Sequence, residues 1–165
     1  MKLIPTASQT VGPFFSIGLT SLYQAAVETH SASAITICGT IFDGDRKPIP
    51  DAVLEFWSAG GFQRVPTSED GSFSVIVSRF SARIEKSEQI PTKHLEVLIF
   101  MRGLLKAVHT RVYLAHAETL KSDPGLKSVP ADRNTTLVAQ KTDAPNQYEW
   151  NVFMQGADET VFFEY

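Results

Sequence analysis

The stretch that decides the fold is Pro91-Thr-Lys-His-Leu-Glu-Val-Leu-Ile-Phe-Met-Arg-Gly-Leu-Leu-Lys-Ala-Val-His-Thr-Arg-Val-Tyr113, the most apolar part of the sequence. Residues 95–101 are apolar except for Glu96, which predicts a strand buried on both faces or nearly so. Arg102-Gly103 interrupts this run, and residues 108–114 resume it with alternation. We therefore predict two core strands joined by a hairpin or a bulged return, with an arginine at the hinge.

The rest of the chain consists of short apolar runs separated by turns. Nine prolines and ten glycines are spread between them, which is typical of an all-β protein. Only residues 19–30 could form a turn or two of helix, and residues 118–132 are expected to be a long surface excursion. We predict an all-β fold, a β-sandwich of about eight short strands over residues 31–165, preceded by an extended N-terminal arm and short helix in residues 1–30. Besides the two central strands, the expected strands are 35–42, 51–57, 72–77, 135–141, 147–154 and 160–165, with 62–66 left uncertain.

Length, charge and cysteine content exclude several classes of protein. A chain of 165 residues suits a single domain with its own core. The net charge is −3 and no basic run is present, so nucleic acid is not an expected partner. The single cysteine, Cys38, lies in an apolar run and is expected to be an inert core residue, which fits a cytoplasmic protein. We expect neither a signal peptide nor a membrane helix.

The arm, residues 5–18, is polar at first and then apolar. The pair Gly12-Pro13 stops both helix and strand, so the chain is extended or turning there. One interpretation is a flexible tail. The other is a segment docked on another surface, because the adjacent Phe14 and Phe15 are unfavourable in water.

Two pairs of polar residues lie in the central strands. His94 and Glu96 are two apart, so they face the same side of a strand and could share a metal ion. Two ligands do not make a site, however, and a packed histidine bonded to its neighbour is the simpler interpretation. His109 and Arg111 share a face in the same way, and a structural contact or an interface is the simpler explanation there too.

Arg102 is the residue most in need of a function. Arginine is costly to bury without an anionic partner, and its planar fork suits a carboxylate. Exposed backbone at the Thr10-Val-Gly12-Pro13 turn would let an aromatic ring approach closely. There is no nucleophile elbow, phosphate loop or cysteine pair to suggest a hydrolase or a nucleotide enzyme. The residues alone therefore indicate a β-sandwich that binds a ligand.

Several segments together resemble the intradiol ring-cleavage dioxygenases, and among them the alpha subunits of the protocatechuate 3,4-dioxygenase family. The similarity runs in order from Thr6 to the last residue. The segments that carry it are Ser8-Gln-Thr-Val-Gly-Pro-Phe-Phe15, Ile41-Phe-Asp-Gly-Asp45, Pro50-Asp-Ala-Val-Leu-Glu-Phe-Trp57, Ile99-Phe-Met-Arg-Gly-Leu-Leu105, His109-Thr-Arg-Val-Tyr113 and Gln155-Gly-Ala-Asp-Glu-Thr-Val-Phe-Phe-Glu-Tyr165.

The resemblance implies an αβ protomer assembled into larger oligomers. A separate beta subunit would hold one Fe(III) through two tyrosines and two histidines, and would open the substrate ring with O₂ to give 3-carboxy-cis,cis-muconate. In this chain Glu96 replaces the second histidine of the iron-binding His-x-His strand, and no tyrosine lies between Tyr23 and Tyr113. The resemblance therefore implies no catalytic residue and no iron in this chain alone. It also implies a shortened loop directly after Trp57, which would affect part of the subunit contact.

The same resemblance assigns four residues to the substrate pocket at the subunit interface. These residues are Thr10, Gly12, Pro13 and Arg102. The aromatic acid substrate and the iron-bearing beta subunit are the partners that it implies.

Two alternatives stay open from the sequence. The first is a transthyretin-like or carboxypeptidase-regulatory-like β-sandwich acting as a binding module, which the segments Asp43-Gly44, Pro50-Asp-Ala52 and Asp70-Gly-Ser-Phe73 would fit equally well. That alternative leaves the arm and the C-terminal segment unexplained. The second is a self-sufficient metal enzyme using His94, Glu96, His109 and His116.

Overall fold

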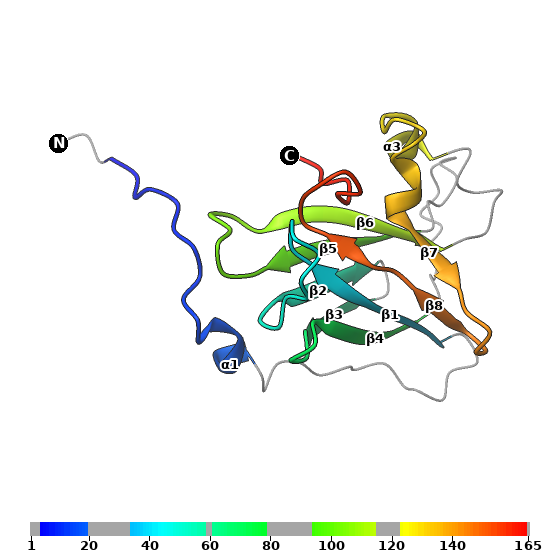
Figure 1. Cartoon of the computed structure of the whole chain (residues 1–165), viewed down its shortest axis with the longest axis horizontal. Coiled ribbons are helices and arrows are strands. Elements are labelled where there is room, and N and C mark those ends of the chain that lie inside the picture. Colours follow the sequence, from blue (N-terminus) through cyan, green and yellow to red (C-terminus); the bar gives the residue numbers. More distant parts are fainter. Residues whose placement is uncertain (1–3, 20–33, 59–60, 79–93, 115–122, 165) are drawn as a thin grey trace.

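The computed structural model describes residues 4–19, 34–58, 61–78, 94–114 and 123–164, and nine strands form its body (Figure 1). One short helix precedes them, and a second helix and a 3-10 turn interrupt their order. The elements are α1 (Phe15–Leu19), β1 (Ala34–Phe42), β2 (Val53–Ser58), β3 (Gly61–Pro66), β4 (Ser72–Ser78), β5 (His94–Phe100), β6 (Val108–Leu114), α3 (Pro124–Lys127), η2 (Asn134–Leu137), β7 (Val138–Lys141), β8 (Gln147–Glu149) and β9 (Val152–Phe153).

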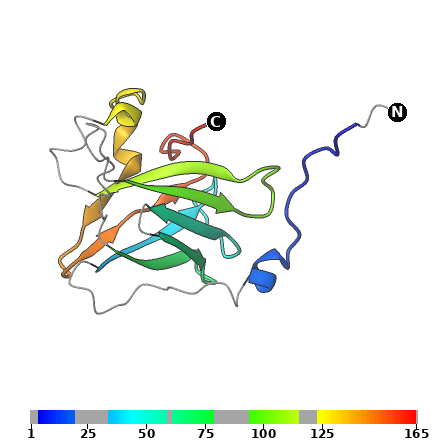
Figure 2. The ribbon, with the colours of Figure 1, turned by 180° about the vertical axis from the view of Figure 1, so that it is seen from behind.

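The strands form one continuous sheet in the order β3-β2-β5-β6-β7-β8-β1-β4, with β9 beside β1. Most neighbours are antiparallel, but β7 runs parallel to β6, and β8 and β9 run parallel to β1. Seen from opposite sides in Figures 1 and 2, the sheet curls back on itself into two layers. The predicted all-β sandwich is confirmed.

Alternating apolar residues from both layers fill the space between them. On β1, Ile35 and Ile37 are fully buried, and they lie opposite Val77 and Val75 of β4. The inward residues of β2 and β5 face them from the other layer and belong to the same apolar cluster. Burial of this kind contributes about 25 cal/mol per Å² of apolar surface, so the alternation of these strands is what stabilises the fold.

The central strand β5 corrects one prediction. Its buried residues are Leu95, Val97 and Ile99, whereas Leu98 and Phe100 are only half-buried, so one face rather than both lies in the core. The reason is that the opposite layer packs against the face of Leu95, Val97 and Ile99, whereas the face that carries His94 and Glu96 lies outside this core. The hairpin between β5 and β6 is confirmed, with antiparallel pairing from His94–Tyr113 to Ile99–Val108.

The C-terminal part of the chain differs from prediction in three places. Residues 160–165 do not form a strand in their described part, because Thr160 is buried against Phe153 and only Phe163 makes a bridge, to His109. The expected strand 147–154 is broken into β8 and β9 at Trp150, and the expected strand 135–141 begins as the 3-10 turn η2. The uncertain segment 62–66 is strand β3.

The segment predicted as a surface excursion is anchored in its described part. Asp123 is buried and caps α3, accepting hydrogen bonds from the N–H groups of Gly125 and Leu126. Leu126 and Val129 are buried in a second apolar cluster on the outer side of β6. Residues 115–122 lie outside the described part of the chain.

The N-terminal arm extends away from the sandwich over residues 4–14 and then enters α1 (Figure 1). The helix expected at 19–30 falls on residues that, apart from Leu19, are not described. Helix α1 begins instead at Phe15, whose N–H donates to the carbonyl of Gly12 at 3.2 Å. In the described part of the chain, no helix is both long and apolar enough to cross a membrane.

Candidate functional site

The hinge between β5 and β6 is a tight turn over residues 101–104. The N–H of Leu104 donates to the carbonyl of Met101 at 3.4 Å, which places Arg102 and Gly103 at the two central positions. Gly103 has φ +92°, as the third residue of a type II turn requires. A side chain at Gly103 would meet no atom within 4 Å, so it is the backbone conformation and not lack of space that favours glycine.

The turn is joined to the arm by one hydrogen bond. The N–H of Gly103 donates to Oγ1 of Thr10 at 2.9 Å, across 93 residues of sequence. Figure 1 shows the arm passing the β5–β6 loop at this point. The structure thus brings Thr10 and the Arg102 turn together.

Arg102 is half-exposed and held on one side. Its Nε donates to Oδ2 of Asp51, and 56% of its side chain is accessible, against 23% for Asp51. In the register of β2 and β5, Val53 lies opposite Phe100, so continuing the two strands sets Asp51 opposite Arg102. The resemblance did not single out Asp51. The strand register, once known, identifies it.

Gly12 and Pro13 follow Thr10 in the arm, and both are exposed. A side chain on Gly12 would meet nothing within 4 Å in this chain. Their assignment to a substrate pocket therefore stays a prediction, since any surface that they line would have to come in part from another molecule.

A second polar group lies on the outer face of β5 and β6, with Glu96 at its centre. Its carboxylate is 3.0 Å from Nε2 of His94, 3.0 Å from Nε2 of His109 and 3.0 Å from Nε of Arg111. We call these four residues the Glu96 cluster. The cross-strand register pairs Glu96 directly with Arg111. Residues two apart face the same side of a strand, so His94 and His109 lie on that face too, as the sequence spacing predicted.

The Glu96 cluster is packed on its far side by α3 and the C-terminal tail. The guanidinium of Arg111 lies 4.9 Å from the ring centre of Phe163, and Nδ1 of His94 is 3.6 Å from Oδ2 of the buried Asp123. A Cβ on Gly125 would come within 2.2 Å of Arg111 Nη1, so the guanidinium would have to move from this position if another residue replaced Gly125. Burial raises the pKa of the neighbouring Tyr113 to about 12, which keeps its hydroxyl protonated.

The donor set of the Glu96 cluster does not fit a ferric ion. Both oxygens of Glu96 are engaged by nitrogen donors, and Arg111 brings a fixed positive charge to the place where a metal ion would have to bind. No three His, Cys, Asp or Glu side chains of the described segments form a group that could hold a metal ion. His116, the remaining candidate ligand, lies outside those segments, and the absence of iron from the whole chain stays a prediction.

Two pKa values in the cluster are displaced. Burial lowers the pKa of His109; the attraction of Glu96 opposes this shift, and the positive charges of Arg111 and His94 add to it. Burial would raise the pKa of Glu96, but the hydrogen bond from His94 and the charge of Arg111 outweigh it and hold that pKa below its usual range. The cluster at neutral pH is therefore an ionised Glu96 among a neutral His109 and a charged Arg111.

Stability is expected to fall when the pH is lowered from about 6.5. Because folding lowers the pKa of His109 below its usual 6.5, the unfolded chain binds a proton more readily in this range. The contribution of His109 is complete above pH 6.5 and is lost as the pH drops toward its folded pKa. Denaturant unfolding of the wild type and of His109→Asn between pH 5 and 7.5 measures this, and the variant should have a flatter profile. Equal slopes for the two proteins would contradict the assignment.

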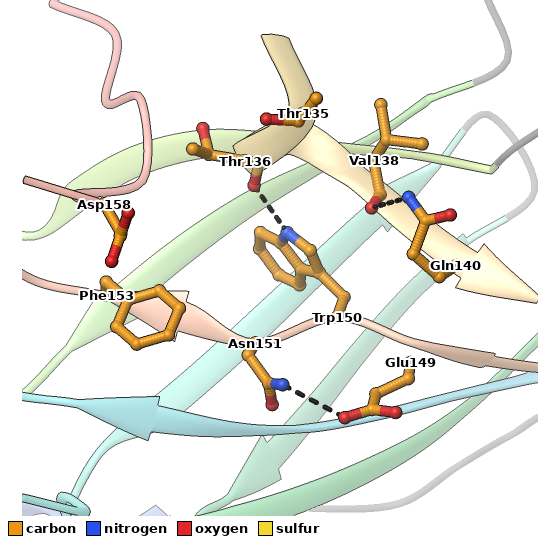
Figure 3. Close-up of a pocket in the computed structure, with 9 residues that line it drawn as sticks. All are labelled: Thr135, Thr136, Val138, Gln140, Glu149, Trp150, Asn151, Phe153 and Asp158. Atoms are coloured by element: carbon orange, nitrogen blue, oxygen red, sulfur yellow. Dashed lines mark hydrogen bonds between the residues drawn. The ribbon is translucent and has the colours of Figure 1, made fainter. Parts of the chain in front are cut away.

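A separate hollow of about 410 Å³ lies beside η2, β7, β8 and β9 (Figure 3). Three of its side-chain donors are already engaged within it: Trp150 Nε1 on the carbonyl of Thr136, Asn151 Nδ2 on Glu149, and Gln140 Nε2 on the carbonyl of Val138. None of the four predicted pocket residues lines this hollow. We therefore take the turn with Arg102, and not this hollow, as the candidate site.

Large apolar side chains are exposed in the arm, in α1 and in the loop after the β5–β6 turn. Phe14 is 74% exposed and Ile17 66% exposed at the end of the arm, and Leu105 is 64% exposed in the loop that follows Gly103.

Comparisons with known proteins give a consistent result. The chain is 35% identical to a protocatechuate 3,4-dioxygenase alpha chain from Burkholderia cepacia, with 96% of each chain covered, and 28% identical to the alpha chain from Pseudomonas putida, with 100% of this chain and 99% of the relative covered. No protein-family profile matches the chain.

The first alignment runs over 190 positions, at least 25 more than the 165 residues of this chain, so the relative has segments that this chain lacks. That difference agrees with a shortened chain without locating the loss at Trp57.

Solved structures of low sequence identity share the fold. The dioxygenase domain of a carbohydrate-binding fusion protein from Streptomyces sp. SirexAA-E superimposes with a TM-score of 0.59 at 18% identity, over 79% of this chain and 85% of that one. Catechol 1,2-dioxygenase from Acinetobacter radioresistens gives 0.58 at 17% identity, over 87% of this chain and 59% of that one. On the strength of the full-length sequence match, this chain belongs to the family of protocatechuate 3,4-dioxygenase alpha chains.

Proposed function

We propose that this chain is the non-iron alpha subunit of a protocatechuate 3,4-dioxygenase and completes the substrate pocket for intradiol cleavage of protocatechuate by O₂ to 3-carboxy-cis,cis-muconate. Its partner is a separate beta subunit that holds the Fe(III), in an αβ protomer of a larger oligomer. The observation that carries the proposal is the half-exposed, oriented guanidinium of Arg102, set beside an arm that is bonded to the same turn.

The chemistry of the substrate fits this arrangement. Protocatechuate is a flat benzoate with two adjacent hydroxyl groups on the side of the ring away from its carboxylate. A guanidinium binds a carboxylate through two parallel hydrogen bonds, which fixes both position and orientation. Arg102 holds the carboxylate end, so the hydroxyl groups are directed away from this chain and toward the partner. The exposed backbone at Gly12 and Pro13 offers a surface against which the ring can lie.

The chemistry of the Glu96 cluster and the exposed apolar side chains support a separate beta subunit as the partner. The donor set of the Glu96 cluster does not suit an iron ion, which supports a metal held by the partner subunit. Phe14 and Ile17 are exposed on the arm and α1, and Leu105 is exposed in the loop after Gly103, so these apolar side chains are available for contact with that other chain. The match over nearly the whole chain, arm included, does not favour a transthyretin-like binding module.

Co-expression with an iron-bearing beta chain tests the proposal. The αβ complex should cleave protocatechuate, measured by O₂ uptake and by the loss of substrate absorbance, and the beta chain alone should not. A beta chain that assembles correctly and is fully active without this chain would overturn the proposal.

The bond between Thr10 and Gly103 provides a milder test. Thr10→Val keeps the shape of the side chain but removes the acceptor of the Gly103 N–H. Because water can replace the lost acceptor at this exposed position, we expect a loss of about 0.5–1 kcal/mol in arm docking and a two- to fivefold rise in KM of the complex. Thr10→Ser keeps a hydroxyl acceptor and should behave like the wild type. A Thr10→Val enzyme with unchanged KM would show that this bond does not position the arm.

A further inference from the structure

We infer that Asp51 is a positioning residue for the substrate carboxylate, acting through Arg102; this inference rests on the function proposed above. Asp51 binds Nε of Arg102. A guanidinium has two edges able to form paired hydrogen bonds, one that includes Nε and one formed by the two terminal nitrogens. Since Asp51 occupies Nε, the edge formed by the two Nη groups is the one presented to a substrate.

Asp51 can do this because its own backbone is fixed. The neighbouring Ala52 is buried, and its N–H donates to Oγ1 of the buried Thr67 at 3.0 Å. The N–H of Thr67 in turn donates to the carbonyl of Ala52 at 2.9 Å. On the other side, Ile49 is buried and donates to the carbonyl of Ile41 at 2.9 Å. The carboxylate of Asp51 is therefore attached to a well-anchored segment just before β2 begins.

Among the residues that the structure describes, Asp51 is the side chain that holds the Arg102 guanidinium. It lies at a central position of an exposed turn, and more than half of its side chain is accessible. An arginine in that position has many rotamers, and fixing one of them on substrate binding costs conformational entropy. Asp51 restricts those rotamers before the substrate arrives, which is how a pre-organised site gains affinity.

Asp51 also carries a negative charge, so the opposite role has to be considered. A carboxylate that competed with the substrate for the same edge of Arg102 would weaken binding. The contact through Nε favours orientation over competition, because it leaves the Nη pair for the incoming anion. The two roles predict opposite changes in KM when Asp51 is removed.

The test uses the assembled αβ enzyme with Asp51→Asn and Asp51→Ala. We expect KM for protocatechuate to rise about 3- to 10-fold for Asp51→Ala and less for Asp51→Asn, with kcat nearly unchanged, as for the loss of one orienting hydrogen bond. For catechol, which has no carboxylate, KM should not change. In the double variant Asp51→Ala/Arg102→Ala, KM should equal that of Arg102→Ala alone, because Asp51 acts only through Arg102.

A matched control is available at another surface ion pair. Asp158 contacts Arg46 in an exposed pair, and Asp158→Ala should leave both KM values unchanged. An unchanged or lowered KM for protocatechuate in Asp51→Ala would overturn the inference, and so would an equal rise for catechol. If instead Arg102→Ala itself has no effect on KM, the proposed function of the hinge fails, which is a distinct result.

Discussion

Replacing Arg102 by alanine is expected to raise KM for protocatechuate in the assembled enzyme by about 10- to 100-fold. The variant loses a charge-assisted, two-point contact with the substrate carboxylate, and such contacts contribute about 1.5–3 kcal/mol. The loss should be confined to substrates with a carboxylate, so KM for catechol should stay close to that of the wild type. Steady-state kinetics with the two substrates measures the effect.

The same variant should have little effect on folding. Arg102 is 56% exposed and makes a surface ion pair with Asp51, and such pairs contribute about 0–1 kcal/mol. Arg102→Lys is an informative companion: it keeps the charge but loses the fork, so it should fall between wild type and alanine. Arg46→Ala removes a somewhat more exposed arginine from its pair with Asp158 and serves as the control. A fall in unfolding free energy as large as the loss in substrate binding would make Arg102 a structural residue.

Replacing Glu96 by alanine is expected to lower the free energy of unfolding by about 2–3 kcal/mol. Its carboxylate is the common partner of His94, His109 and Arg111, and its removal takes the Glu96 carboxylate away from a largely buried guanidinium. Breaking a fully buried pair costs about 3–5 kcal/mol, and the figure is reduced here because 32% of the Glu96 side chain is accessible. For a chain of this size the melting temperature should fall by roughly 5–10 °C.

Two comparisons make the Glu96 prediction specific. Glu69→Ala removes an exposed carboxylate from the loop before β4 and should change stability by less than about 0.5 kcal/mol. In Glu96→Ala/Arg111→Ala the guanidinium that faced the missing carboxylate is gone as well, so the double variant should lose less than the sum of the two single losses. Additive losses would mean that the two residues stabilise the fold independently.

The sequence was sufficient for the features that depend on local pattern. The alternation of residues 35–42 and 72–77 predicted β1 and β4, because neighbours two apart point to the same side of a strand. The break at Arg102-Gly103 predicted the hinge, and the spacing of His94 with Glu96 and of His109 with Arg111 predicted that each pair shares a face. A resemblance carried by short segments was enough to predict the family.

Other features depended on contacts between distant segments. Continuous hydrophobicity in β5 did not reveal that one face is partly open, because burial depends on what the opposite layer covers. The aromatic end of the chain has the composition of a strand, yet Thr160 is held against Phe153 and the segment meets β6 only through the bridge between Phe163 and His109. Asp123 is in a polar segment and is nevertheless buried, because it caps α3 under the second apolar cluster.

In the candidate site too, some features follow from the local sequence and others depend on contacts between distant segments. The sequence by itself determined that Arg102 stands at a turn and that Thr10 belongs to an arm, but these are 92 residues apart and no local rule joins them. Only the tertiary structure decided that the arm binds the turn through Gly103 and that Asp51 lies across from Arg102. The physical reason is that the packing of the whole sheet sets strand register and loop docking. That packing places Asp51 beside Arg102 and so orients the guanidinium.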